Sequence, residues 1–395
     1  MLGMRLGCHV AVAAAAVIVA LASGAAPAQI MIVGNDEKPG WDEAGKPKLR
    51  EPGHDTLSII DMSKPEALRM IATIPLANSI VGPPTNLAVS PSRDIALVAN
   101  SVNGVAKDGG FAIVSDDKLF VIDLKASPPA VSSTVSTGKR PSGLAIAADG
   151  KLALVTNRDD GTISVLSIAG KEVKVTDTVS VGTGADQVTA VAITPDGKRA
   201  LAAKTAANKI ALLTIAGDKV TYDKRDLPVG IFPYNVVISP DGKLALTADN
   251  GNGGTSDGNI DTVSVIDLEA NPVRVIDHIA VADSPEGLAF SPKGNLAVSI
   301  NAQGSNFPKD TWFHHPTGSV SVLKIEDKEV SLVAEIPVGT FPEGAVFSAD
   351  GAYLYVGNFI DQNLSVLKVD GDKLTDTGQP FKLPGHPASM RGGPQ

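Results

Sequence analysis

The amino-acid sequence predicts an all-β fold, a seven-bladed β-propeller whose blades are four-stranded antiparallel sheets. Two observations lead to this prediction. A short apolar run followed by a turn recurs along the chain, and each copy is followed by three further apolar runs. The two ends of the chain together hold the strands of one more unit, which brings the expected number of blades to seven.

The repeating unit reads as four short strands. Its first run ends in an Asp-Gly or related turn, and its second run ends in asparagine or a substitute, as in Ala153–Asn157. A third alternating run such as Thr162–Leu166 and a fourth such as Val179–Gly182 complete the unit. The first runs of the six complete units are Asn86–Arg93, Gly143–Gly150, Ala190–Gly197, Asn235–Gly242, Gly287–Gly294 and Gly344–Gly351. A single meander of this kind cannot bury both faces, so we expect the sheets to stack radially.

The first blade is predicted to draw its strands from both ends of the chain. Three apolar runs that match strands two, three and four precede the first repeat, at Ile30–Asn35, Thr56–Asp61 and Ile71–Leu76. The missing inner strand is expected at the C-terminus, where Pro387–Arg391 resembles Pro141–Ala145. Pairing between the two ends closes the ring and removes the free sheet edges.

Residues 1–28 are predicted to be a secretory signal peptide, followed by one propeller domain over residues 29–395. Arg5 precedes the unbroken apolar run Val10–Ala22, and the small-residue triplet Ala26–Ala28 suits cleavage. The run is short for a bilayer span, which needs roughly 20 residues. An uncleaved anchor is the alternative. We therefore expect a periplasmic or secreted protein with no membrane insertion after signal cleavage.

The mature chain is expected to be acidic and free of cysteine. Cys8, the single cysteine, lies in the predicted signal, which excludes disulfide and thiol chemistry from the mature protein. The net charge of −9 becomes one unit more negative when the signal, which holds one basic and no acidic residue, is removed. This charge disfavours nucleic acid as a partner. The expected partner is a small-molecule ligand or a periplasmic protein.

The ends of the second runs resemble a known repeat signature. Leu97–Asn100, Leu154–Asn157 and Tyr355–Asn358 are similar to the Tyr-Val-Thr-Asn motif of YVTN-repeat propellers. That group belongs to a larger one that includes lactonase-like propellers. The resemblance covers almost all of the mature chain and implies the seven-bladed fold. It does not assign an activity, because this architecture hosts many.

Four enlarged loops are predicted on one face of the propeller, which we call the top face. Loops after strands two and four share this face, and the long ones are Asp36–Asp55, Ser101–Asp117, Asn250–Asp261 and Ala302–Gly318. They carry the candidate ligand-binding residues Trp41, His54, Trp312, His314 and His315. We expect these side chains to form a lid over a ligand. The alternative is that they order the loops by packing.

A second group of candidates lies where the inner strands enter the central channel. Alignment of the units places Tyr234, Glu286 and Glu343 at one position of neighbouring blades, with His386 and Arg140 just before the adjacent prolines. Tyr234 is a ligand-binding candidate, and the other four are catalytic candidates. Glu286, Glu343 and His386 are also predicted to bind a divalent metal as a cofactor or to act as acid and base. The alternative is a hydrated channel mouth.

A ring of asparagines ends the second strands. Most copies are interpreted as structural, because asparagine tolerates turn geometry and bonds its own backbone. Lys204 and Asp249 break the pattern and are predicted to bind the ligand, unless they form a plain salt bridge across the channel. Some propellers of the lactonase-like group hold a metal through Glu, Asn and Asp, and this resemblance adds Asn301 and Asn358 as metal-ligand candidates.

These observations support three hypotheses of function. The first is a protein that binds a small molecule or metal in a funnel at the centre of the top face. The second, implied by the resemblance, is a lactonase-like hydrolase that uses a metal or an acid–base pair in the same funnel. The third is a protein-interaction scaffold.

Overall fold

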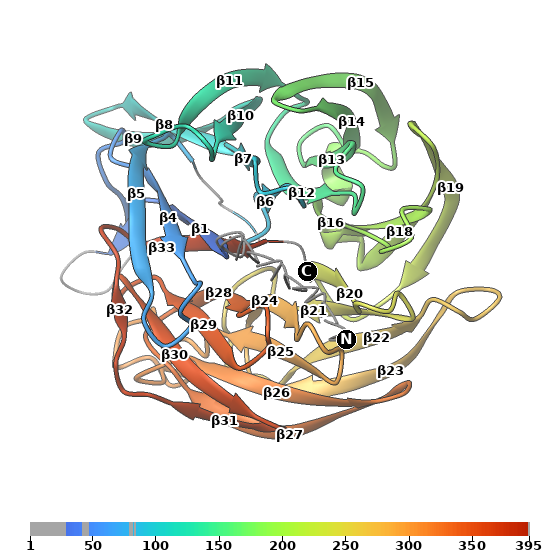
Figure 1. Ribbon diagram of the computed structural model, residues 1–395. Helices are drawn as coiled ribbons and strands as arrows, with labels where there is room; N and C mark the ends of the chain where they lie inside the picture. The colour runs from blue at the N-terminus through green and yellow to red at the C-terminus, as the bar shows by residue number, and fades with distance from the viewer. Residues whose placement is uncertain (1–28, 42–46, 79–81, 83, 394–395) are drawn as a thin grey trace, which may run out of the picture.

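The computed structural model describes residues 29–41, 47–78, 82 and 84–393, and these form a seven-bladed β-propeller (Figure 1). Each blade is a four-stranded antiparallel sheet, with its first strand beside the central channel and its fourth at the rim. The predicted fold class is therefore confirmed. In the described ranges the helical content is limited to two 3-10 turns, η1 (Gly184–Asp186) and η2 (Thr205–Ala207).

The strands of each blade follow one another from the channel outward. Blade one holds β33 (Pro387–Gly392), β1 (Ile30–Asn35), β4 (Thr56–Asp61) and β5 (Arg69–Pro75). Blade two holds β6 (Leu87–Val89), β7 (Ile95–Ala99), β10 (Lys118–Asp123) and β11 (Ala130–Ser136). Blade three holds β12 (Pro141–Ile146), β13 (Leu152–Asn157), β14 (Thr162–Ala169) and β15 (Glu172–Ser180). Blade four holds β16 (Val188–Ile193), β17 (Arg199–Lys204), β18 (Lys209–Ala216) and β19 (Lys219–Pro228).

The other three blades repeat this order. Blade five holds β20 (Pro233–Ile238), β21 (Leu244–Asp249), β22 (Asp261–Asp267) and β23 (Arg274–Val281). Blade six holds β24 (Pro285–Phe290), β25 (Leu296–Asn301), β26 (Ser319–Glu326) and β27 (Glu329–Pro337). Blade seven holds β28 (Pro342–Phe347), β29 (Tyr353–Asn358), β30 (Asn363–Asp370) and β31 (Lys373–Asp376), and β32 (Phe381–Lys382) also pairs with β30.

The C-terminal strand closes the ring as predicted. β33 pairs antiparallel with β1, with Met31 opposite Gly392 and Val33 opposite Met390. The outer strand of this blade begins and ends slightly earlier than expected, since β5 spans Arg69–Pro75. The predicted signal peptide, residues 1–28, lies outside the described residues. Among the described residues we find no helix of the length and apolar character needed to span a membrane.

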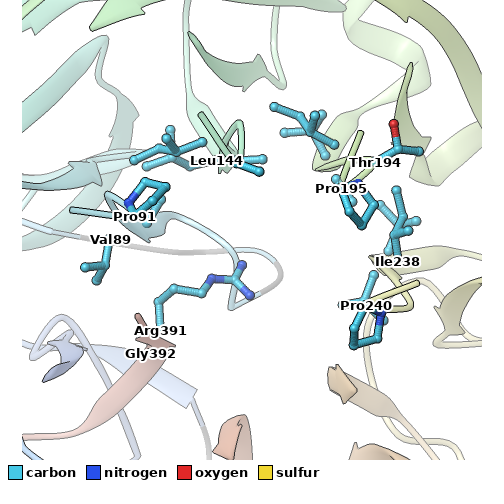
Figure 2. Close-up of a pocket in the computed structure, with 18 of the residues that line it drawn as sticks. Val89, Pro91, Leu144, Thr194, Pro195, Ile238, Pro240, Arg391 and Gly392 are labelled. Atoms are coloured by element: carbon cyan, nitrogen blue, oxygen red, sulfur yellow. The ribbon is translucent and has the colours of Figure 1, made fainter. Parts of the chain in front are cut away.

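Two of the four enlarged top loops contain strands of their own. In blade one, β2 (Pro39–Trp41) and β3 (Pro47–Leu49) pair as a small ribbon. In blade two, β8 (Val102–Lys107) and β9 (Gly110–Ser115) do the same. At the opposite end of the channel, the inner strands of blades two to five line a cavity with residues Arg391–Gly393 of the C-terminal segment (Figure 2).

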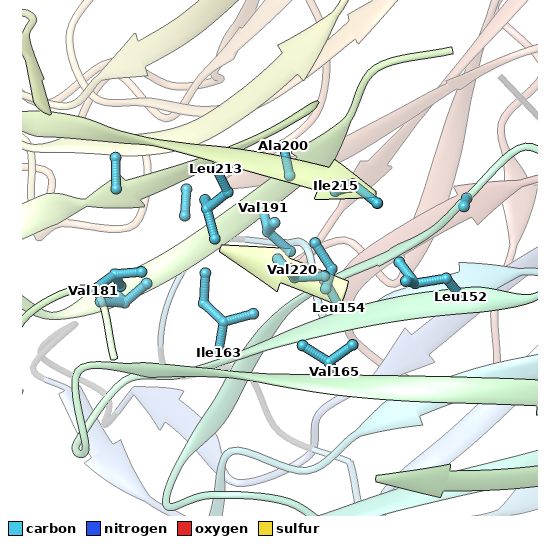
Figure 3. Close-up of a cluster of buried hydrophobic side chains, with 14 residues drawn as sticks. Leu152, Leu154, Ile163, Val165, Val181, Val191, Ala200, Leu213, Ile215 and Val220 are labelled. Carbon is cyan, nitrogen blue, oxygen red and sulfur yellow. The ribbon is translucent and has the colours of Figure 1, made fainter. Parts of the chain in front are cut away.

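The hydrophobic core lies between neighbouring blades rather than inside any one of them. Between blades three and four, Leu154, Ile163 and Val165 face Ala200 and Leu213 (Figure 3). These side chains are aliphatic, in keeping with the low aromatic content of the chain. Each sheet therefore depends on both neighbours for burial, as radial stacking requires.

Candidate functional site

A cavity of about 400 Å³ occupies the top mouth of the channel. We call it the funnel. Tyr234, Glu286, Glu343 and Ala388 of four successive blades contribute to its wall. Residues of β2 and β3 also line it, so the loop insertion of blade one forms part of the wall. Further lining side chains belong to Asp36, Lys48, Phe341 and Phe359.

A β-bulge at the start of the inner strand sets the direction of the funnel side chains in three blades. The register with the second strand skips one residue in blades five, six and one, and the skipped residues are Tyr234, Glu286 and Ala388. A bulged residue is left out of the ladder, and its side chain can be redirected. The following Gly287 allows close approach of blade seven, because a Cβ there would lie 2.4 Å from the Glu343 carbonyl oxygen.

Glu286 is a buried carboxyl group with only 4% of its surface exposed. Asn250 Nδ2 and Ser284 Oγ each lie 3.3 Å from its Oε1 and donate to it. Burial raises the pKa of Glu286 to about 8, against those two hydrogen bonds, and the charges of Asp261 and Asp283 raise it further. Glu286 is therefore predominantly protonated at neutral pH.

Glu343 is also buried, at 8% exposure. Burial raises its pKa well above the ordinary value, and the neighbouring Glu286 and Asp36 add to the effect. No described residue is placed to donate a hydrogen bond to its carboxyl group. The funnel therefore presents two carboxyl groups from neighbouring blades whose pKa values are both raised, and Glu343 is without a hydrogen-bond donor in the described part of the chain.

The pKa of the Tyr234 phenol responds to charges on both sides of the channel, including those of two arginines. Burial raises the pKa of the Tyr234 phenol well above its usual range, and Glu286 and Glu343 act in the same direction. Arg158 and Arg140, both of blade three, oppose this effect. Burial lowers the pKa of Arg158. Arg140 contacts Asp159 at 3.6 Å. The phenol therefore lies between an acidic and a basic side of the channel.

His386 is held by residues other than the two glutamates. Its Nδ1 lies 2.7 Å from Glu37 Oε2, and its Nε2 lies 3.2 Å from Arg50 Nη1 and 3.0 Å from Gln362 Nε2. Phe359 packs against the ring with centroids 5.1 Å apart. These partners assign the tautomer with the proton on Nδ1, because two donors face Nε2. Burial alone raises the pKa of Glu37, but the ring and backbone hydrogen bonds from His386 and the charge of Arg50 outweigh this, so the pKa of Glu37 is lowered.

The described residues do not assemble the predicted metal centre. Across residues 29–41, 47–78, 82 and 84–393, no three His, Cys, Asp or Glu side chains come together in a way that fits a metal ion. The expected combination of Glu286, Glu343 and His386 is not formed, because Glu37 binds Nδ1 of the imidazole and Arg50 and Gln362 face its Nε2. Asn301 and Asn358 are also engaged, since their amides donate to Ser321 and Ser365 of their own blades at 2.8 and 2.9 Å.

Lys204 and Asp249 have separate partners. Lys204 Nζ pairs with Asp226 at 3.0 Å and with Asp186 at 3.6 Å. Asp249 accepts hydrogen bonds from Thr247 at 2.7 Å and Thr262 at 3.0 Å, and its burial raises the pKa to about 6 against those bonds. The salt bridge considered between the two residues is not formed. Both replace asparagine in the ring and bond within their own blades.

Four of the remaining loop candidates, His54, Trp312, His314 and His315, do not line the funnel. Trp312 is 79% exposed, and His54 and His315 are exposed as well. His315 Nδ1 lies 3.2 Å from the carbonyl oxygens of Gln303 and Phe313, a contact that orders the loop. His314 is half-buried in the same loop. Trp41 ends β2, beside the funnel residues Pro39 and Gly40, and its side chain is outside the described part. A ligand role for these residues stays a prediction.

Sequence reasoning missed the position that follows the asparagine ring. The residue after strand two faces the next blade or the funnel in several blades. Asn250 donates to the Pro285 carbonyl and to Glu286, and Phe359 supports His386. Asp36 and Arg158 occupy the same position in blades one and three. The available signal was the period of two along a strand, which turns adjacent side chains to opposite faces.

A buried ion cluster anchors the blade-one insertion beside the funnel. Lys38 Nζ contacts Asp36 at 3.1 Å and forms a short contact with Asp55, and the three side chains are almost fully buried. Burial and Asp36 raise the pKa of Asp55, while Lys38 lowers it. Asp36 also lines the funnel, so the same carboxylate helps to hold the blade-one insertion in place and adds negative charge to the site.

Comparison with solved structures finds several proteins with a similar propeller fold. The periplasmic gluconolactonase of Pseudomonas aeruginosa matches with a TM-score of 0.69 at 18% identity, over 93% of this chain and 99% of that chain. A 6-phosphogluconolactonase-like protein of Bacteroides fragilis matches with a TM-score of 0.68 at 18% identity, over 92% and 98%. Hydrazine synthase of Kuenenia stuttgartiensis matches with a TM-score of 0.61 at 19% identity, over 80% and 90%.

These similarities define the class by fold. The chain is a seven-bladed β-propeller, as the repeats indicated, and its fold is similar to that of proteins described as lactonases. Comparison of the sequence with protein families and with curated proteins finds no match. The same fold in proteins with different reactions, such as the hydrazine synthase, means that function depends on the site.

Proposed function

We propose that the protein binds a small, uncharged, oxygen-rich molecule in the funnel, in the periplasm or outside the cell. The observation that supports this most directly is the pair of buried carboxyl groups of Glu286 and Glu343, which neighbouring blades present in one cavity. A protonated carboxyl group offers both a donor and an acceptor. Two of them beside the Tyr234 phenol suit a ligand that carries several hydroxyl or carbonyl groups.

The rest of the wall is consistent with this ligand class. Phe341 and Phe359 pack edge to face with centroids 5.8 Å apart, and both line the funnel. Aromatic surface beside a few polar groups is usual in small-molecule sites. A ligand with a fixed negative charge would approach Glu286, Glu343 and Asp36 and would raise the energy of any carboxylate among them. A neutral polyol or sugar lactone avoids this cost.

The similar solved structures narrow the class of ligand further. The Pseudomonas aeruginosa protein is described as a periplasmic gluconolactonase. A sugar lactone is therefore the first ligand to test, and the predicted signal peptide agrees with a periplasmic location. The proposal involves no metal, because the described residues do not fit one.

Calorimetric titration with gluconolactone, gluconate and glycerol tests the proposal. The lactone is expected to bind, and Glu286→Ala and Glu343→Ala are each expected to weaken binding by about tenfold or more, since alanine offers neither the donor nor the acceptor of a protonated carboxyl group. Glu329→Ala, on the exposed face of β27, is the matched control and should bind like the wild type. Equal affinity in all four proteins would contradict a ligand in the funnel.

Lactone hydrolysis is a second candidate, favoured by the different neighbours of the two carboxyl groups. Glu286 has a pKa of about 8 and is ionised at mildly alkaline pH, where it can take a proton from water. Glu343, whose pKa is also well above the ordinary value, can then donate a proton to the leaving oxygen. The lactone ring opens by breaking its acyl C–O bond as the water oxygen bonds to the carbonyl carbon.

Rates measured against pH separate binding from catalysis. If Glu286 is the base, ring opening above the uncatalysed rate should rise through about pH 8 and disappear in Glu286→Gln. If the lactone binds but is hydrolysed no faster than in buffer alone, the binding function stands and the hydrolase function is excluded. An interaction scaffold becomes the preferred hypothesis only if neither binding nor turnover is found.

A further inference from the structure

The bottom mouth of the channel contains a second cavity, separate from the funnel. Its volume is about 270 Å³, and inner-strand residues of blades two to five form most of its wall (Figure 2). Most lining side chains are apolar, among them Leu144, Ile193, Val236 and Ile238. In the described part of the chain, Arg391 is the one charged residue that lines it, and Figure 2 shows its guanidinium pointing into the opening.

Arg391 departs from the pattern of all six other blades. It lies opposite Ile32 in the pairing of β33 with β1, and Ile32 stands three residues before the ring asparagine of that blade. The residues at the same register position of the other inner strands are Ala88, Ala145, Ala192, Val237, Ala289 and Val346. A small aliphatic side chain therefore satisfies this position structurally, and the arginine needs another explanation.

The guanidinium has little compensation from the protein. Its Nε donates to the Leu87 carbonyl oxygen at 3.2 Å. No described carboxylate lies within ion-pair distance of it, although the chain as a whole is acidic. Burial lowers the pKa of Arg391 to about 10, so the group stays charged at neutral pH at an energetic cost. An anion that entered the cavity would remove part of that cost.

We propose that the bottom cavity binds a small monocarboxylate with an apolar body, whose carboxylate pairs with Arg391. A planar guanidinium can donate two parallel hydrogen bonds to a carboxylate, which makes the contact directional. The apolar wall would bury the rest of the ligand and stabilise it in proportion to the area removed from water. A single cation matches a single negative charge, which favours a monocarboxylate over a phosphate dianion. This site is independent of the funnel and of the function proposed for it.

Titration calorimetry of the full chain with hexanoate, hexanol and inorganic phosphate tests the proposal. Hexanoate is expected to bind, and hexanol and phosphate are expected to bind at least tenfold more weakly. Arg391→Ala should abolish hexanoate binding, and because alanine occupies this position in four other blades the variant should keep its fold, as circular dichroism and melting would verify. Arg391→Lys should retain weakened binding. Glu286→Gln, in the funnel, should bind hexanoate like the wild type.

Several outcomes would overturn the proposal. Absence of hexanoate binding to the wild type refutes the site, and binding that survives Arg391→Ala places the ligand elsewhere. Phosphate binding as tight as that of hexanoate refutes the ligand class, because the apolar wall would then contribute nothing. Loss of lactone binding in the funnel variants has no bearing on these results.

Discussion

Replacement of Glu286 by glutamine should change how the stability of the protein depends on pH. The pKa of Glu286 is about 8 in the folded chain, compared with an ordinary value of 4.5. Between these values the folded chain holds a proton that the unfolded chain has released. The free energy of unfolding therefore falls as the pH rises through this window, and the loss is complete above about pH 8. Glutamine has no proton to lose, so the variant lacks this contribution.

The magnitude follows from the size of the shift. Each pH unit across the window changes the free energy of unfolding by about 1.4 kcal/mol, so the full effect is on the order of 5 kcal/mol. Between pH 5 and pH 8 the variant should gain about 4 kcal/mol relative to the wild type. For a chain of this length such a change corresponds to a shift of about 5 °C in Tm. Burial also raises the pKa of Asp261 to about 7, so its deprotonation lowers the free energy of unfolding further as the pH rises. The wild type and Glu286→Gln share this contribution.

Thermal melts of both proteins at pH 5, 6, 7 and 8 provide the assay. We expect the Tm of Glu286→Gln to rise relative to that of the wild type at every step. Glu329→Gln, whose carboxyl group is exposed, controls for the general effect of removing one negative charge. Parallel pH profiles of the wild type and Glu286→Gln would refute a protonated Glu286 in the folded protein, and with it the assignment of donors in the funnel.

Three further predictions concern closure, the ion cluster and export. Deletion of residues 385–395 removes β33, exposes β1 and should cause aggregation or a large loss of Tm; an unchanged melt would contradict closure by this strand. Lys38→Met leaves Asp36 and Asp55 buried without their cation and should cost about 3–5 kcal/mol in urea unfolding at pH 7. The cost should shrink at lower pH as Asp55, whose pKa is raised, gains its proton, and a pH-independent cost would contradict the ion cluster. Exported protein should have the intact mass of residues 29–395; a mass that includes Cys8 would contradict cleavage after Ala28.

Only part of the candidate site was predictable from the sequence. Repeat alignment placed Tyr234, Glu286 and Glu343 at one position, and the structure brings all three to one cavity. His386 instead contacts Glu37, near the other end of the chain, together with Arg50 and Gln362, and a catalytic role for it stays a prediction. Asp36 and Arg158 could not be predicted, because the asparagine before each of them recurs from blade to blade whereas the residue after it varies. The local sequence pattern indicates which side chains alternate between the two faces of a strand. It does not indicate which residue from a distant part of the chain each side chain contacts.

The sequence by itself determined the architecture, because each blade is a local meander whose four apolar runs and turns recur at a recognisable period. It also determined closure, since Pro387–Gly392 repeats the inner-strand pattern without the three strands that normally follow. Only the tertiary structure decided the chemistry of the two channel mouths. Charge and protonation depend on burial and on side chains contributed by blades far apart in the chain. Glu286 holds its proton, and Arg391 lies without a described carboxylate, because of neighbours that no local window of sequence contains.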